Sequence, residues 1–318
     1  MRGGTDTLES KGVPVASFAV AVAVGPKDEE LARTQDLIDS VGAWERHDGW
    51  FIMVDDAPRP RGLDRSLRFP TSLRPIALHH PRHGRVIIYK RGKGICSAVL
   101  LALQAAARQT TCDFMLKLDT DSLVIGPFVE RVTRFFDERP RVGNIGAYTQ
   151  TPNGDSRDFT RNGNNIRSLH QPSFDWSMPL TSLRRRRDPT LRTIRGHIER
   201  AVANGYQYGE HCLGGGYAIR RALLDAMNAA GFLDDPALWL AIDCPEDVMA
   251  GLYTRAAGFE LANCVGEGEV FGVRHKGLPF ELDELVRRQF AIIHAVKNDP
   301  RYPEEQVRQF FRARRPGD

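Results

Sequence analysis

Short apolar runs alternate with segments of helical periodicity through the first half of this chain, and this alternation constrains the fold more than any other feature. Four runs have the length and composition of buried strands: Ala16–Val24, Trp50–Val54, Arg85–Tyr89 and Phe114–Leu118. Helical periodicity covers Asp28–Val41 and Gly94–Arg108, and Ala57–Gly84 is predicted to be a Pro- and Arg-rich loop. The alternation predicts an α/β fold with a mostly parallel, Rossmann-like sheet flanked by helices, which binds ligands at the carboxyl ends of its strands.

The second half of the chain is less regular. Its expected elements are a strand at Asn144–Thr149, a helix at Ala222–Ala230, and a helix from Pro245 to about Ala257 that Gly258 ends. The segment Gln150–Pro179 is rich in Asn, Ser, Asp, Gly and Pro, with Phe174 and Trp176 interleaved. Such a segment is typical of a binding loop or lid, although a disordered insertion has the same composition.

Carboxylates stand where two of the predicted strands end. Asp119 and Asp121 follow Phe114–Leu118, and Asp55 and Asp56 follow Trp50–Val54. Because residues i and i+2 share one face of a strand, Asp119 and Asp121 can approach a single divalent cation and hold it against a diphosphate. Taken alone, so short a motif also fits a strand end capped by solvated acids.

Three further patterns carry candidate site residues. Gly214-Gly215-Gly216 would let backbone approach a ligand closely, or would serve a tight bend. Glu246 and Asp247 open the predicted helix, where a carboxylate can complement the helix dipole or act as a general base. His275 ends a strand-like run; it suits a structural role, or could join the aspartates as the nitrogen ligand that favours Mn²⁺.

Composition limits the classes of protein to which this chain can belong. With 318 residues, 42% of them hydrophobic and 26% charged, it can bury a large core in one extended domain or two smaller ones. Five cysteines form no C-x-x-C pair, which argues against a zinc cage or a disulfide framework and favours a reducing, cytoplasmic location. The apolar run from Val13 to Val24 is about half the ~20 residues that a spanning helix needs, and it reads as a strand.

The net charge of +4 is unevenly distributed. Seven arginines lie between Thr181 and Ala201, four of them consecutive at 184–187, and five more lie between Arg301 and Asp318. Apolar residues at helical spacing accompany the first block: Leu191, Ile194, Ile198 and Val202. This pattern predicts an amphipathic helix, and it is compatible with peripheral contact at the inner surface of a membrane, with another anionic partner, or with a solvated face.

Six short motifs in sequence order resemble those of inverting nucleotide-sugar glycosyltransferases with the GT-A fold. They are Ala21–Pro26, Phe51–Asp56, Arg91–Gly94, Leu118–Asp121, Gly214–Tyr217 and Glu246–Val248. The front half is similar to family-2-type transferases, whereas Cys212–Tyr217 and Glu246–Gly251 are similar to β-1,3-galactosyltransferase and fringe-like enzymes. The sequence departs from the family where Ala-Pro follows Asp55-Asp56, and Gln150–Tyr208 matches no known pattern.

The resemblance implies a role for individual residues. It assigns donor binding to Gly25, Pro26, Asp55, Lys93, Asp119, Asp121 and Gly215; metal binding to Asp119, Asp121 and His275; and catalysis to Asp247 and Glu246, with Asp247 as the base. Outside the resemblance, the aromatic face of Trp176 and the charges of Arg185 and Glu210 make these residues our candidates for acceptor contacts. The resemblance divides the chain into a tail (1–15), a nucleotide-sugar-binding half (16–149), an irregular acceptor-binding and catalytic half of the same domain (150–280) and a helical basic C-terminal tail (281–318).

The implied enzyme is a hexosyltransferase-like protein that uses Mn²⁺ or Mg²⁺. Its donor would be a nucleoside-diphosphate-sugar, with a UDP-sugar favoured, and its acceptor a glycan or a lipid-linked molecule; no nucleic acid partner is expected. Two alternatives stay open at this point. A sugar-nucleotidyltransferase also reads a nucleotide with a parallel sheet and a metal, and a non-catalytic module could bind an anionic polymer through the arginine blocks.

Overall fold

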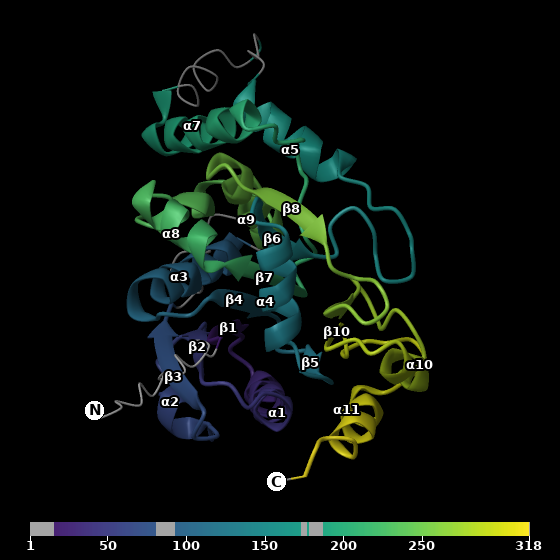
Figure 1. Ribbon diagram of the computed structural model, residues 1–318. Coiled ribbons are helices and arrows are strands. Elements are labelled where there is room, and N and C mark those ends of the chain that lie inside the picture. The colour runs from purple at the N-terminus through teal and green to yellow at the C-terminus, as the bar shows by residue number, and fades with distance from the viewer. Residues whose placement is uncertain (1–15, 81–92, 173–176, 178–186, 318) are drawn as a thin grey trace, which may run out of the picture.

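A seven-stranded sheet forms the centre of the computed structural model, which describes residues 16–80, 93–172, 177 and 187–317 (Figure 1). Its strands lie in the order β3-β2-β1-β4-β7-β6-β8. Their bounds are β1 Phe18–Val24, β2 Gly49–Asp55, β3 Leu73–His79, β4 Phe114–Leu118, β6 Val142–Gly146, β7 Gly216–Arg220 and β8 Glu260–Asn263. All neighbours pair in parallel except β7, which is antiparallel to both β4 and β6. The predicted α/β class with a mostly parallel sheet is therefore confirmed.

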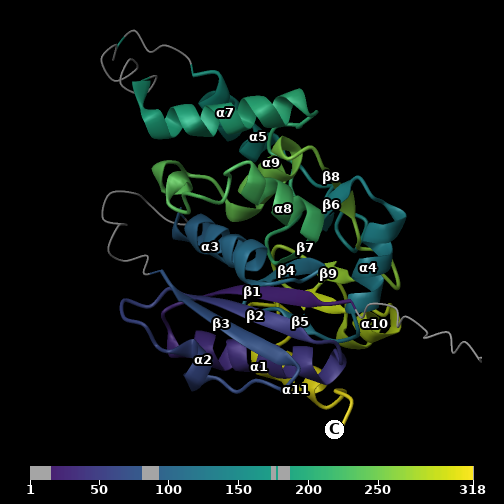
Figure 2. The ribbon, with the colours of Figure 1, turned by 60° about the vertical axis from the view of Figure 1, so that its left-hand side comes forward.

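Helices cover both faces of this sheet (Figure 2). Their bounds are α1 Asp28–Trp44, α2 Leu63–Ser66, α3 Lys93–Gln109, α4 Val129–Glu138, α5 Thr160–His170, α7 Pro189–Ala203, α8 Arg221–Ala229, α9 Glu246–Ala256, α10 Leu282–Arg287 and α11 Glu304–Arg312, with a 3₁₀ turn, η2, at Leu238–Ala241. The alternation within β1 shows why two faces form: Ala19 and Ala21 pack with α3, whereas Val20 and Val22 pack with α1 and α4. Small alanines on one face let α3 lie close to the sheet.

A second, three-stranded sheet brings the C-terminal segment to the end of β4. It comprises β5 Leu123–Val124, β10 Ile292–His294 and β9 Phe271–Val273, with β10 in the middle. β10 runs antiparallel to β5 and parallel to β9. Residues 281–318 thus contain the expected helix at α11, and they also supply a strand that the sequence analysis did not foresee.

Several predicted elements lie close to their expected positions. The structure contains β1, β2, β4, α1, α3, α8 and α9 as expected, and Gly258 follows α9 with a φ of 86°. The predicted strand Asn144–Thr149 is shifted, since β6 covers Val142–Gly146. The predicted strand Arg85–Tyr89 lies outside the described residues.

Two predicted loops contain regular structure instead. α2 and β3 occupy the predicted loop Ala57–Gly84, and α5 lies within the predicted lid Gln150–Pro179. β3 is an edge strand whose Arg74 and Pro75 are exposed, so it lacks the continuous apolar run of a central strand. α5 buries only Gly163 and Ile166, which leaves a polar sequence with little helical periodicity. In both elements the tertiary position, rather than the local pattern, determines the structure.

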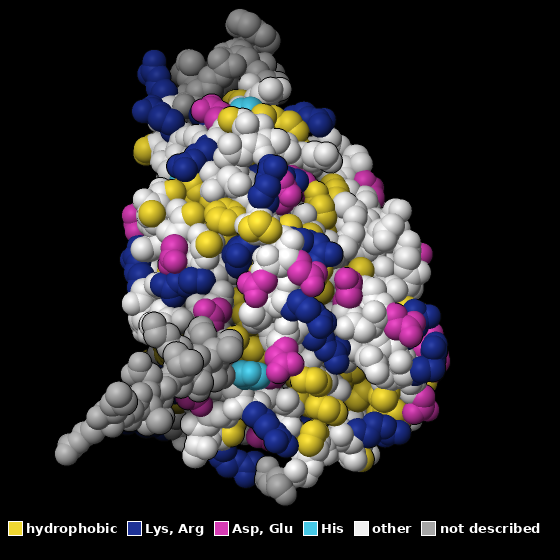
Figure 3. Space-filling view, viewed as in Figure 1, with side chains coloured by type: hydrophobic (Ala, Val, Ile, Leu, Met, Phe, Trp, Pro, Cys, Tyr) yellow, Lys and Arg dark blue, Asp and Glu magenta, His cyan; other side chains and the backbone are white. Residues whose placement is uncertain are grey.

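α7 is the amphipathic helix that the arginine-rich segment predicted. Ile194, Ile198 and Ala201 are buried, and Arg192 and Arg200 are exposed on its other side. Basic and acidic side chains are interspersed over the face of the molecule that Figure 3 shows. No helix in the described part of the chain is both long and apolar enough to cross a membrane.

Helix α11 is attached to α1 by buried ion pairs. Asp36 of α1 accepts hydrogen bonds from Arg308 and Arg315, each at 2.7 Å. Burial raises the pKa of the Asp36 carboxyl, but the hydrogen bonds and charges of Arg308 and Arg315 outweigh burial and leave the pKa below its ordinary value. A buried pair of this kind is costly to break, because the remaining charges lose their partner.

We therefore predict that Asp36→Ala lowers the free energy of unfolding by about 3 kcal/mol at pH 7, measured by urea denaturation. Asp39→Ala, at an exposed position of the same helix, is the matched control. Because the pKa of Asp36 is lowered on folding, its contribution is complete above the ordinary value of 3.8 and is lost as the pH falls below it. Equal stability of the two variants at pH 7 would contradict this role.

Candidate functional site

Three metal-ligating side chains meet at the junction of the two sheets. Asp119 directly follows β4, Asp121 lies in the turn before β5, and His294 is the last residue of β10. The backbone holds the turn and the strand together: the Ser122 N–H donates to the Asp119 carbonyl at 3.0 Å, and the Val296 N–H donates to the Asp121 carbonyl at 3.0 Å. The pairing of β10 with β5 therefore delivers His294 to the two aspartates.

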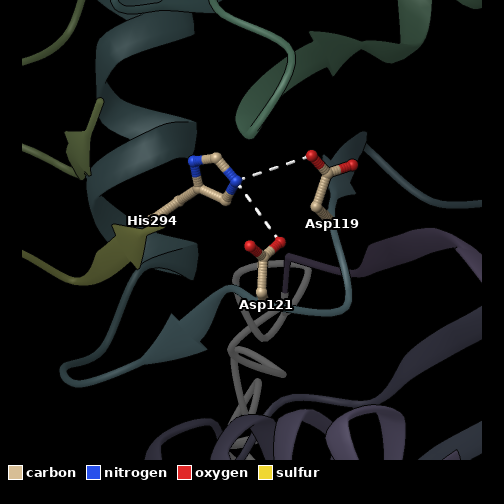
Figure 4. Close-up of side chains that lie close together, drawn as sticks. All are labelled: Asp119, Asp121 and His294. Carbon is tan, nitrogen blue, oxygen red and sulfur yellow. Dashed lines mark ion pairs between the residues drawn. The ribbon is translucent and has the colours of Figure 1, made fainter. Parts of the chain in front are cut away.

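The imidazole of His294 points between the two carboxylates (Figure 4). Its Nε2 lies 3.5 Å from Oδ2 of Asp119 and 3.4 Å from Oδ1 of Asp121. One ligand atom from each residue lies within 4.8 Å of the others. Nδ1 lies 2.8 Å from the Arg274 carbonyl, which can only accept, so Nδ1 carries the proton and donates. That orientation leaves Nε2 to face the acids, as in metal-binding histidines whose other ring nitrogen donates to a backbone carbonyl.

Burial and charge act in opposite directions on this group. His294 and Asp121 are 7% and 9% exposed. Burial raises the pKa of Asp121, but the hydrogen bond and charge of His294 outweigh it, so the pKa lies below its ordinary value. Burial likewise lowers the pKa of His294, and the two aspartates more than reverse that effect. The two carboxylates thus favour the protonated form of the imidazole, and the imidazole favours the ionised form of Asp121.

Gly215 is required by its close approach to His294. A Cβ atom at Gly215 would lie 2.1 Å from Nδ1 of His294, far closer than any contact that the backbone can accept. The carbonyl of the same residue accepts a hydrogen bond from the Ser122 hydroxyl at 2.9 Å. Gly215 of the glycine-rich run thus contacts both the imidazole and the turn that carries the aspartates, and it helps to hold them in place.

Lys117 connects this group to the start of α9. Its ammonium, on a side chain that is 1% exposed, lies 2.7 Å from Oδ1 of Asp119 and 3.1 Å from Oε1 of Glu246, and it also donates to the Gly214 carbonyl. Burial lowers the pKa of Lys117, but Asp119 and Glu246 raise it well above its ordinary value. The side chain is therefore a buried cation at neutral pH, and its contact with Glu246 explains how that residue is accommodated inside the fold.

Asp247 is the second residue of α9 and faces the same cavity. Its Oδ2 accepts from the Gly214 N–H at 3.0 Å, and its Oδ1 accepts from the Val248 N–H at 2.8 Å. Burial raises the pKa of Asp247, and this effect, together with the Glu246 carboxylate, outweighs the lowering by His211, Lys117 and Arg157. A raised pKa makes this carboxylate a stronger base than a solvated aspartate.

A cavity of about 600 Å³ joins these residues. Its lining includes Asp119, Asp121, Gly214, Gly215, Glu246, Asp247 and His294, together with the cationic side chains of Arg274, Lys276 and Lys297. A second cavity of about 620 Å³ is lined by Gly25, Pro26, Glu30 and Arg33, and it shares Lys297 and Asn298 with the first. The short segment after β10 therefore forms a wall common to both cavities.

The cavity brings together six of the residues that the sequence singled out: Asp119, Asp121, Gly215, Glu246, Asp247 and His275. His294, rather than the predicted His275, lies with Asp119 and Asp121. His275 is exposed and lines the same cavity. The signal that could have identified His294 is the apolar pair Ile292-Ile293 before it, because an apolar run that ends in a polar residue is also the pattern of β4 and its aspartates.

Asp55 lies at the end of β2, but its carboxylate is engaged within the protein. It accepts from the backbone N–H groups of Ala57 and Arg61 at 3.0 and 2.8 Å, and from the Arg61 guanidinium at 2.7 Å. The same guanidinium donates to the Gly25 carbonyl at 2.8 Å. Arg61, which the sequence analysis did not select, thus fixes Asp55 to the Gly25-Pro26 turn. The nucleobase of a nucleotide-sugar could bind only to the lone pairs that remain on Asp55.

The residues predicted for acceptor contacts are not gathered at the cavity. Trp176 and Arg185 lie outside the described residues. Glu210 is 0% exposed and accepts from the Arg255 guanidinium at 2.8 Å and from the Tyr148 hydroxyl, so its carboxylate has a structural partner. Lys93, which was predicted to bind the donor, is the first residue of α3.

No family model matches the sequence, and no curated protein matches it. Among solved structures, the chain is similar to the galactosyltransferase LgtC in complex with donor and acceptor sugar analogues, with 12% identity, a TM-score of 0.47, and coverage of 93% of this chain and 95% of LgtC. It is also similar to the bifunctional glycosyltransferase WbbM in its apo form, with 10% identity and a TM-score of 0.48. That match covers 93% of this chain and 49% of WbbM, so this chain spans about half the length of WbbM.

The contact between Gly215 and His294 makes a direct prediction. Gly215→Ala should displace the imidazole and weaken Mn²⁺ binding at least about tenfold. That factor is the lower end for mutations of residues that orient a metal ligand. Electron paramagnetic resonance of free Mn²⁺ would measure the affinity. Gly196→Ala is the matched control, because a Cβ atom at Gly196 meets nothing within 4 Å. Equal affinities of both variants and the unmodified protein would show that the glycine does not position His294 for a metal.

Proposed function

We propose that this chain is a metal-dependent glycosyltransferase of the GT-A type, which moves a sugar from a nucleoside-diphosphate-sugar to an acceptor hydroxyl. The observation that carries the proposal is the placement of Asp119, Asp121 and His294 in one cavity with Asp247. A cation-binding group and a separate base are the two functions that this reaction needs. A UDP-sugar is our preferred donor, and a glycan or a lipid-linked molecule is our preferred acceptor.

The three ligating residues fit a divalent cation such as Mn²⁺ or Mg²⁺. Two carboxylates balance its charge, and an imidazole whose Nδ1 proton is held by the Arg274 carbonyl offers a neutral Nε2. The mixed oxygen and nitrogen set favours Mn²⁺ over Mg²⁺. When bound, such a cation would act as a Lewis acid on the departing diphosphate.

Cations of the protein would complete the diphosphate site. Arg274 and Lys276 are exposed at the cavity, and among the described residues their side chains have no hydrogen-bond or ion-pair partner. Lys297 lines the same cavity and the neighbouring one. Charge-assisted contacts from these side chains to phosphate oxygens would hold the donor, with its nucleoside extending past Lys297 toward Gly25 and Pro26.

Asp247 would act as the general base of a single displacement. The acceptor O–H proton moves to Asp247 while the acceptor oxygen bonds to the anomeric carbon of the donor. The bond from that carbon to the phosphate oxygen breaks, and the nucleoside diphosphate leaves with the electron pair. One displacement inverts the anomeric centre. The two backbone N–H groups that bind Asp247 keep its remaining lone pairs directed toward the cavity.

The first test is the dependence of nucleotide binding on the cation. Isothermal titration calorimetry of UDP in the presence of Mn²⁺ should show binding that EDTA abolishes, and Asp121→Asn should reproduce that loss. Asp137→Asn, at an exposed position of α4, is the matched control and should bind normally. Undiminished UDP affinity in both EDTA and Asp121→Asn would remove the cation from the proposal.

The second test separates donor binding from chemistry. Asp247→Asn should reduce donor hydrolysis by at least ~10², the lower end for acid–base catalysis, while UDP affinity stays nearly unchanged. Hydrolysis would be followed with Mn²⁺ and a panel of UDP- and GDP-sugars, and the anomer released first, read by NMR, would report inversion or retention. Asp243→Asn, exposed just before α9, serves as the control. Retention, or full turnover by Asp247→Asn, would contradict the role of Asp247.

A further inference from the structure

Arg157 lies beyond the residues assigned above, yet it organises the surroundings of Asp247. It follows the short antiparallel bridge between Gln150 and Ser156. Its Nη1 donates to the carbonyls of Ala147 and Tyr148 at 2.6 and 2.9 Å, and also to the His211 carbonyl. Its Nη2 lies 2.7 Å from Nε2 of His211. One half-buried guanidinium thus fixes both the loop and the imidazole.

His211 is held in one neutral tautomer by these contacts. Its Nδ1 lies 2.6 Å from the Gly209 carbonyl and must donate, because a carbonyl cannot. Its Nε2 must then accept from the Arg157 guanidinium, which has only donors. Burial lowers the pKa of this imidazole, which is 4% exposed, and so opposes a second proton. Phe159 packs edge-on against the ring, with the ring centroids 5.3 Å apart.

The proton-free Nε2 of His211 faces the proposed base. It lies 3.5 Å from Oδ2 of Asp247, the oxygen that also accepts from the Gly214 N–H. Because Nε2 of His211 and Oδ2 of Asp247 are both acceptors, no hydrogen bond joins them, and the imidazole leaves the lone pairs of the carboxylate free. The charged groups that act on Asp247 are Arg157, Lys117 of β4 and the adjacent Glu246, and a protonated His211 would lower the pKa of Asp247 as well. The positive charge of Arg157 compensates for the proximity of the ring nitrogen to the carboxylate.

We propose that Arg157 and His211 are positioning residues for the base, which keep a proton-free imidazole nitrogen against Asp247. Without Arg157, Nε2 of His211 would be free to bind a proton and donate it to Oδ2 of Asp247. That hydrogen bond would occupy the lone pair meant for the acceptor. This inference rests on the proposed role of Asp247 as the base. It gives the loop before α5 a function in the reaction through Arg157, without requiring that the loop contact the acceptor.

The experiment is the pH dependence of UDP-sugar hydrolysis with Mn²⁺ for Arg157→Met. The acid limb of the kcat profile should move to higher pH by about one unit: loss of the Arg157 charge raises the pKa of Asp247, and it also raises the pKa of His211, whose protonated ring would then block the Asp247 carboxylate. The KM for the donor should stay unchanged. Arg161→Met removes an exposed arginine a few residues away, and its profile should match that of the unmodified protein.

A second variant keeps the test decisive if Arg157→Met is poorly folded. His211→Gln removes the titrating ring but leaves Arg157 in place, and adding Arg157→Met to it should shift the acid limb by less than Arg157→Met alone. Histidine ¹⁵N NMR of the unmodified protein should show His211 with its proton on Nδ1 down to pH 6. An acid limb that Arg157→Met leaves unmoved, while Asp247→Asn is inactive, would overturn this inference alone. Full turnover by Asp247→Asn would overturn the base as well.

Discussion

A buried cation links the two sides of the proposed site. The ammonium of Lys117 contacts the Asp119 carboxylate, the Glu246 carboxylate and the Gly214 carbonyl from within the centre of the sheet. A charge in that position costs several kcal/mol unless it is fully paired. The pairing therefore forces the end of β4, the glycine-rich run and the start of α9 to converge. The group of Asp119, Asp121 and His294 lies on one side of that convergence, and Asp247 lies on the other.

The acids of the site could be predicted from the sequence because their positions are local properties. A five-residue apolar strand determines where Asp119 and Asp121 emerge, and a proline followed by two acids determines where α9 begins. His294 could not be selected in the same way. It ends a strand of three residues whose partners in β5 are 168 and 170 positions earlier in the chain, and His275 has an equally plausible local sequence. Only the pairing of β10 distinguishes the two histidines.

The partners of predicted residues were harder to foresee than the residues themselves. Asp55 lies at a strand end as expected, but Arg61 engages its carboxylate through a turn that no periodicity reveals. Glu210 precedes the glycine-rich run as a polar residue typically would in a binding loop, yet Arg255 of α9 pairs with it inside the fold. Polar residues of the same type serve either a ligand or the structure, and the partners that the fold brings to each side chain distinguish these roles.

The C-terminal segment makes the site depend on a long-range assembly. α11 docks on α1 through Asp36, and β10 joins β5, so the residues between them are held as the wall shared by the two cavities. Release of this segment would remove His294 and leave Asp119 and Asp121 as neighbouring carboxylates, whose mutual repulsion disfavours the open state. A divalent cation at the two carboxylates would gain the imidazole of His294 as a third ligand only when β10 is in place. Docking of the C-terminal segment and binding of a cation at this group would therefore stabilise one another.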